Sequence, residues 1–176
     1  MHDDSKPDPS PWQWLQHTYW YVLPENIPAL QLNSEQNTLA WIVDQTVWHI
    51  TEFRNGYFWG SSATAIVQPE KQASQDTSVR PVCFSMLGSI TPEGRVYITF
   101  IPETPSGSAT TGIGRAVMHG GQWSLEMQMA TGSRQITAHW AYMTQVKPED
   151  PSWHSLPGVG ISVPQMLHGC RSPQLT

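Results

Sequence analysis

Three segments separated by glycine-containing connections constrain the fold of this chain more than any other feature. Two-residue loops such as Gly-Gly and Gly-Ser form the tight turns that join antiparallel strands into hairpins. The sequence therefore predicts three consecutive antiparallel strands. The segments are residues 112–119, 122–130 and 135–146, and their connections are Gly120-Gly121 and Thr131-Gly132-Ser133.

The hydrophobic pattern of these segments predicts their pairing. If the second connection is a two-residue loop, Trp123 lies opposite Tyr142 and Leu125 lies opposite Trp140, and one face is apolar at every pair. A slip of one residue would destroy this match, because neighbouring residues of a strand point to opposite faces. The four side chains are therefore predicted to face the protein's centre.

The opposite face of the same three strands carries a polar row of Arg115, Glu126 and His139. If the row faces a cavity, Glu126 would hold His139 in one tautomer and raise its pKa. His139 would then act as a general acid or base, and Arg115 would bind an anionic group. If the row faces outward, it is an ion row of little energetic consequence. The more apolar opposite face favours the outward arrangement.

An Asn-Gly dipeptide at residues 55–56 predicts another hairpin with a tight turn. Centring the pairing on this turn places Trp48 opposite Ala63 and His49 opposite Ser62. The histidine then has a hydroxyl partner on the neighbouring strand. It is predicted either to contact a ligand or to be a hydrogen-bonded sheet residue.

A further turn at residues 91–94 contains Pro, Glu and Gly in the order of a type I turn. It predicts that Met86 pairs with Phe100 and Gly88 with Ile98. Eight or nine strands joined mostly by short hairpins form either an up-and-down barrel or a sandwich. We expect the barrel, because closure removes exposed edge strands.

The predicted fold is therefore all-β: one domain over residues 1–176, with an antiparallel up-and-down meander that closes into a barrel of about eight strands. Residues 1–9 are predicted to be a loose arm, and a short helical turn follows it. Residues 147–176, which are rich in Pro and Gly, are predicted to be an irregular tail that covers the barrel's ends together with the helical turn.

A Trp-rich helical turn, then Thr18-Tyr19-Trp20-Tyr21, then a meander of hairpins resembles the calycin superfamily, which comprises lipocalins, fatty-acid-binding proteins and avidins. Trp20 matches the Trp of the lipocalin Gly-x-Trp signature, whereas Thr18 stands at the position of the Gly. The resemblance implies a calycin-like barrel with a small-ligand cavity at one end.

We therefore expect a small apolar or aromatic ligand in an aromatic-lined cavity, although a core filled by interlocking side chains is an open alternative. Two other functions stay open: an isomerase, cyclase or hydrolase that uses His139 and Glu126, and an assembly module that forms a homodimer. The predicted ligand-binding residues are Trp20, Trp48, His49, Trp59, Ser62, Trp123, Trp140 and Tyr142.

Composition excludes several partners. The net charge is -5 and the nine basic residues are scattered, so no nucleic-acid-binding patch is expected. No apolar run has membrane-spanning length, and no metal or cofactor motif is present. Cys83 and Cys170 fit no redox or metal spacing. Reduced thiols and a cytoplasmic location are expected, with a disulfide as the alternative.

Overall fold

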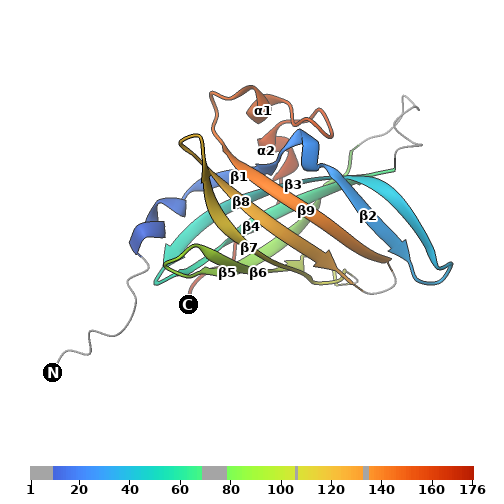
Figure 1. The fold of residues 1–176 in the computed structure, drawn as a ribbon, viewed down its shortest axis with the longest axis horizontal. Coiled ribbons are helices and arrows are strands. Elements are labelled where there is room, and N and C mark those ends of the chain that lie inside the picture. The colour runs from blue at the N-terminus through green and yellow to red at the C-terminus, as the bar shows by residue number, and fades with distance from the viewer. Residues whose placement is uncertain (1–9, 69–78, 106, 133–134) are drawn as a thin grey trace.

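The computed structural model describes residues 10–68, 79–105, 107–132 and 135–176, so the predicted arm at residues 1–9 lies outside the described part. The described strands form one antiparallel sheet that closes into a barrel, as predicted (Figure 1). This closed architecture is consistent with a calycin-like fold. The strands are β1 (Thr18–Val22), β2 (Pro28–Asn33), β3 (Thr38–Arg54), β4 (Tyr57–Val67), β5 (Val82–Ile90), β6 (Arg95–Pro102), β7 (Thr110–His119), β8 (Gln122–Thr131) and β9 (Gln135–Val146).

Nine described strands fill eight positions around the barrel, because β1 and β2 share one position. Both pair with β3 on one side and with β9 on the other. The short 3-10 helix η2 (Pro24–Asn26) separates them. Pro24 and Pro28 lack the N–H that a continuous ladder would need, which explains the interruption. One position of the barrel wall is therefore split in the middle.

Two hairpins have the predicted register. Gly88 lies opposite Ile98 between β5 and β6. Arg115 lies opposite Glu126 between β7 and β8. The turn residues 120–121 have φ angles of 55° and 81°, which glycine adopts without the strain of a side chain. Turn chemistry and hydrophobic alternation agree in these hairpins, and the prediction is confirmed.

The β3–β4 hairpin has the predicted turn but a different pairing in its middle. A β-bulge in β3 shifts the register by one residue. Trp48 therefore lies opposite Ser62 rather than Ala63, and His49 lies opposite Ser61. The predicted pairs of these two residues are wrong, because a turn sets the register only as far as the next bulge.

The pairing of β8 with β9 differs from the prediction by three residues. Leu125 lies opposite Met143 rather than Trp140. Because three is an odd number, every side chain of β9 points to the other face. The last pair before the connection is Thr131 with Thr137, so the loop is longer than two residues. The first residues of β9 extend beyond this pair and lie along β2 instead.

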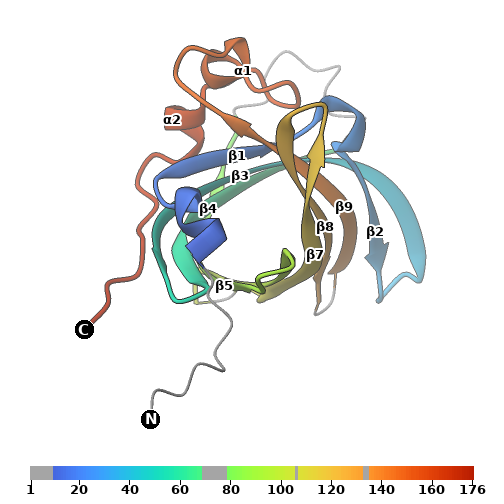
Figure 2. The ribbon, with the colours of Figure 1, turned by 60° about the vertical axis from the view of Figure 1, so that its left-hand side comes forward.

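Tryptophans close one end of the barrel. Trp12 and Trp14 come from the 3-10 helix η1 (Ser10–Leu15), which is the predicted N-terminal turn. Their rings lie 5.1 and 5.9 Å from the ring of Trp123, and Trp14 also lies 6.1 Å from Trp20. Figure 2 shows η1 in front of this end of the barrel. We call these four residues the tryptophan plug.

Thr18 fixes one residue of the plug. The Trp20 indole N–H donates to Thr18 Oγ1 over 2.8 Å. The Thr18 hydroxyl in turn donates to the carbonyl oxygen of Leu15. Trp20 is fully buried, so its polar nitrogen needs this partner.

The C-terminal tail packs against the outside of the barrel and contains two short helices, α1 (Pro151–His154) and α2 (Val163–Met166). Leu156, Val163 and Met166 are buried in a second apolar cluster with outward-facing residues of β3 and β4. Figures 1 and 2 show both helices outside the wall, beside β1. The tail was predicted to cover an end of the barrel, and the part described here lies on the outer surface of the wall instead.

A disulfide joins Cys83 of β5 to Cys170 of the tail. The expectation of reduced thiols is therefore wrong, and the cytoplasmic location that we inferred from them loses its support, because disulfides persist in oxidising compartments. The two cysteines are 87 residues apart and meet only because the tail folds back on the barrel.

None of the helices in the described ranges has the length and apolar character needed to cross a bilayer.

Candidate functional site

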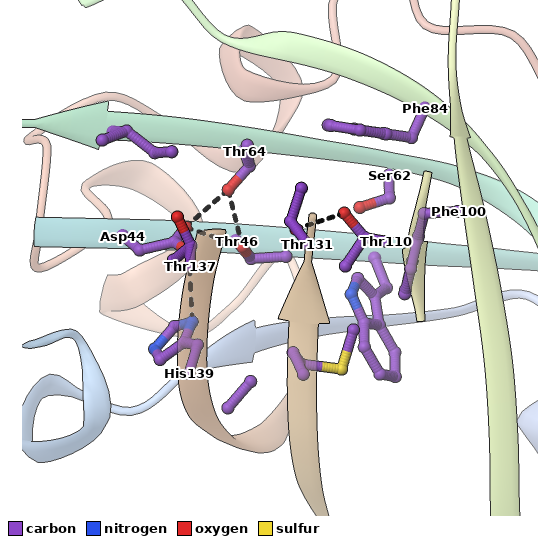
Figure 3. A pocket seen from close by; sticks show the side chains of 14 residues that line it. Asp44, Thr46, Ser62, Thr64, Phe84, Phe100, Thr110, Thr131, Thr137 and His139 are labelled. Carbon is purple, nitrogen blue, oxygen red and sulfur yellow. Dashed lines mark hydrogen bonds and ion pairs between the residues drawn. The ribbon is translucent and has the colours of Figure 1, made fainter. Parts of the chain in front are cut away.

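A cavity of about 110 Å³ lies inside the barrel, at the end away from the tryptophan plug (Figure 3). A wider hollow of about 510 Å³ at the same end shares Phe84 and Thr131 with the cavity, so this is the end from which the cavity opens. The lining residues are Asp44, Thr46, Trp48, Ser62, Thr64, Ile66, Phe84, Phe100, Thr110, Met129, Thr131, Thr137, His139 and Ala141.

Part of the lining is aromatic. Trp48 and Phe100 pack together with their ring centroids 5.3 Å apart. Phe84 meets Phe100 edge to face at 6.5 Å. Met129 adds a flexible apolar side chain. These groups give the cavity one apolar wall.

The rest of the lining is polar and centres on Asp44, which is 8% exposed. Asp44 and Thr46 alternate with Trp48 along β3, so all three point into the barrel. The Thr64 hydroxyl donates to Asp44 Oδ1 over 2.6 Å, and the Thr46 hydroxyl lies 3.1 Å from the same oxygen. The two hydroxyl oxygens lie 2.7 Å apart. Figure 3 shows these contacts between neighbouring strands.

His139 forms a buried ion pair with Asp44. Its Nδ1 lies 3.2 Å from Asp44 Oδ2, and its Nε2 lies 2.6 Å from the carbonyl oxygen of Asn26. Both partners are acceptors, so this arrangement suits the imidazolium form, which donates from both ring nitrogens. Burial lowers the pKa of His139, but the hydrogen bond and charge of Asp44, with the Asn26 carbonyl, outweigh it and raise the pKa above its ordinary value.

The split position in the wall supplies one of these contacts. Asn26 is the last residue of η2, where the ladder between β1 and β2 is interrupted. Its carbonyl oxygen has no strand partner there and accepts from His139 instead. The next carbonyl, that of Ile27, accepts from the backbone N–H of Asp44 over 3.0 Å. The interruption thus fixes both members of the ion pair.

Two further features complete the polar lining. Thr110 and Thr131 form a second hydroxyl pair with an oxygen–oxygen distance of 2.6 Å. Ser62 lines the cavity opposite Trp48. Trp48 is fully buried, yet among the described residues its Nε1 has no hydrogen-bond partner. A buried N–H without an acceptor is rare and costly.

The predicted ligand-binding residues are divided by the structure. Trp48 and Ser62 line the cavity. Trp20 and Trp123 lie at the closed end, in or against the core. The other four are on the outside of the wall: His49 stacks on Tyr19, Trp59 lies opposite the exposed Leu87, and Trp140 packs with Tyr142.

The predicted row of Arg115, Glu126 and His139 does not exist. Glu126 pairs with Arg115 at 3.2 Å and with His119 at 2.8 Å, on the outside of the barrel. The hydrogen bond from His119 and the Arg115 guanidinium lower the pKa of Glu126. His139 points inward because of the three-residue register difference, and its carboxylate partner is Asp44. The row therefore splits into an outer ion cluster and an inner ion pair.

Most of the polar lining was not predicted, although the sequence carries a signal for it. Asp44-x-Thr46-x-Trp48, Ser62-x-Thr64 and Thr137-x-His139 are alternating polar positions in strands. Such a pattern is typical of a strand whose inner face lines a polar space. The face that carries His139 was predicted to point outward, because the opposite face of β9 is more apolar, and Asp44, Thr46 and Thr64 were not singled out.

The described residues contain no cluster of three or more His, Cys, Asp and Glu side chains placed to hold a metal ion. No protein-family model, curated protein or solved structure matches the chain. The geometry of the cavity is therefore the basis for a functional assignment.

Proposed function

We propose that this protein binds a small molecule in the cavity at the open end of its barrel. The observation that supports this proposal is the lining, in which an aromatic wall faces hydroxyl groups and a buried ion pair around an internal space. A barrel of about eight strands can fill its interior with side chains or hold one small ligand. Burying this many polar groups is costly in a core that only needs to be stable.

Binding is favoured over catalysis by the state of His139. A general base needs a ring nitrogen that is free to accept a proton from the substrate. Both nitrogens of His139 already face acceptors inside the protein, Asp44 on one side and Asn26 on the other. The ion pair is therefore suited to organising the cavity, and acid–base work on a ligand would first require one of these hydrogen bonds to break.

The test is native mass spectrometry of the protein purified without denaturation, followed by extraction and identification of any small molecule. Ala141→Leu narrows the cavity, whereas Ala138→Leu adds the same side chain to the exposed face of the same strand. We expect the wild type and Ala138→Leu to carry the same bound mass and Ala141→Leu to lose it. If no small molecule copurifies and none added from a library of ring compounds changes the melting temperature, the proposal is wrong.

A second candidate, self-association, is supported by an outer groove. We use this name for the exposed surface along β2, β3, β7 and β9 that Leu30, Trp41, Ile113 and Trp140 line. Trp41, Ile113 and Trp140 are 64%, 57% and 56% exposed, and apolar patches of this kind often mark interfaces. Light scattering after size-exclusion chromatography tests it. We expect the wild type to be a dimer. Trp41→Ser should convert it to a monomer, whereas Tyr57→Ser, which lies outside the groove, should leave it a dimer. A monomeric wild type would refute the self-association.

A further inference from the structure

The indole nitrogen of Trp48 is the feature of the cavity that the protein's own contacts do not explain. Trp20, equally buried in the same barrel, donates its indole N–H to Thr18 over 2.8 Å. Trp48 lines the cavity, and its Nε1 has no acceptor among the residues that the structure describes. An indole nitrogen can only donate, so among the described residues this donor is left for an acceptor that a molecule in the cavity would bring.

The hydroxyl groups of the cavity show what else a ligand would meet. The protons of Thr46 and Thr64 are already directed to Asp44 or to each other. One proton of the Thr110 and Thr131 pair is used between these two residues. The hydroxyl oxygens keep free lone pairs. The lining is therefore rich in acceptors, and Trp48 is its fully buried unsatisfied donor.

The charge of the lining limits the ligand further. Asp44 and His139 are the ionisable side chains among the described lining residues, and they neutralise each other at 3.2 Å. An ionic ligand would lose its hydration and find no counter-charge that is not already paired. The cavity is thus built for a neutral molecule.

The volume of the cavity limits the size of the ligand. An engineered apolar cavity of about 150 Å³ binds benzene; this cavity measures about 110 Å³ and adjoins the wider hollow at Phe84 and Thr131, so a single small ring whose substituent extends toward the hollow is the size that fits. Trp48, Phe84 and Phe100 give this space an aromatic wall on which a ring can stack. We propose that the ligand is a compact neutral ring that carries an oxygen acceptor, such as a carbonyl, and that this oxygen accepts the Trp48 indole N–H. This inference rests on the binding function proposed above.

The experiment compares two probes of nearly equal shape, cyclohexanone and methylenecyclohexane, of which only the ketone has an acceptor. Cyclohexanecarboxylate is the charged probe. Each is titrated into the full-length, disulfide-bonded protein labelled with nitrogen-15, and the indole N–H resonances are followed by NMR. Trp48→Phe removes the donor and identifies its resonance. Trp20→Phe is the matched control, because it removes an equally buried indole N–H that already has a partner.

We expect the ketone to bind about three- to tenfold more tightly than the hydrocarbon, as one hydrogen bond provides, and to move the Trp48 indole proton downfield. The preference should fall to about onefold in Trp48→Phe and persist in Trp20→Phe. If Trp48→Phe does not fold, the downfield shift in the wild type decides the question, with the resonance assigned through its contacts with Phe100.

Equal binding of ketone and hydrocarbon, with the Trp48 indole proton unmoved, would overturn the inference and leave the binding function intact. Tighter binding of the carboxylate would overturn the neutral ligand class. If none of the three probes moves any resonance of a lining residue up to its solubility limit, both the inference and the binding function of this cavity fail.

Discussion

Replacing Asp44 by Asn separates the charge of the buried ion pair from its shape. Asn has nearly the same volume, and its amide oxygen can still accept from Thr46 and Thr64, the donors that lie 3.1 and 2.6 Å from Asp44 Oδ1. Its NH2 group would face Nδ1 of His139, where Asp44 Oδ2 now lies 3.2 Å away. The variant can therefore satisfy a neutral His139 but not a charged one.

The pH dependence of stability follows from the pKa of His139. In the wild type this pKa is raised above the unfolded value of about 6.5. The ion pair therefore contributes its full stability below about pH 6.5, and the contribution is lost as the pH rises through the folded pKa. In Asp44→Asn burial dominates and lowers the pKa of His139, so folding then expels a proton and stability rises with pH.

Because the pKa of His139 is raised in the wild type and lowered in Asp44→Asn, the difference in unfolding free energy between the two proteins depends on pH. Removing one partner of a buried ion pair costs about 3–5 kcal/mol while the other stays charged. The loss of one hydrogen bond in the neutral state costs about 1 kcal/mol. We therefore expect Asp44→Asn to lose about 3 kcal/mol near pH 5.5 and about 1 kcal/mol near pH 8.5, with a slope of at most about 1.4 kcal/mol per pH unit.

The assay is urea unfolding at several pH values, followed by far-UV circular dichroism with the disulfide intact. The difference between the two proteins isolates His139, because the other histidines are common to both. In a His139→Gln background, Asp44→Asn should have the same effect at every pH. Parallel stability curves for the wild type and Asp44→Asn would refute the reasoning, because they would mean that the charge of His139 does not depend on Asp44.

Three further predictions test other parts of the structure. Replacing Cys83 and Cys170 by Ser removes a cross-link over 87 residues and should lower the unfolding free energy by about 2–5 kcal/mol; an equal loss on reducing the wild type checks this, and no loss would argue against the disulfide. Gly60→Ala should lower the free energy of unfolding by more than about 3 kcal/mol, because its Cβ would lie 1.9 Å from a backbone oxygen of β3. Gly132→Ala, whose Cβ meets nothing within 4 Å, should change it by less than about 0.5 kcal/mol in the same assay. Glu126→Gln should change stability by less than about 1 kcal/mol and leave ligand binding unchanged; a larger loss would show that the outer ion cluster is more than a surface feature.

Parts of the fold could be predicted because local signals agreed. The β5–β6 and β7–β8 hairpins have turn residues that fix the loop length and strands whose apolar positions alternate in phase with it. Short hairpins following one another also predicted an up-and-down sheet, and closing it removes the edges. The inward positions of Leu125 and Met127 followed from the same alternation.

The site depended on contacts that no local pattern encodes. β9 has two alternating faces, one with Trp140 and one with His139, and burial of the more apolar face predicted the wrong one. The choice is made by neighbours on both sides of β9. One is β8, and the other is the split position, where the Asn26 carbonyl oxygen accepts a hydrogen bond from His139. Asp44 belongs to a strand distant in sequence, so its pairing with His139 follows only from closure of the barrel.

The amino-acid sequence by itself thus indicated most of the strands, the β5–β6 and β7–β8 hairpins and the closed sheet, because turn geometry and strand alternation act over a few residues. Only the tertiary structure decided which side chains of β9 face inward, where Cys83 meets its partner, and that the cavity is polar as well as aromatic. Burial of the more apolar face of a strand predicts which side chains point inward only where the interior is an apolar core. Beside the polar cavity, the more apolar face of β9 lies on the outside of the barrel.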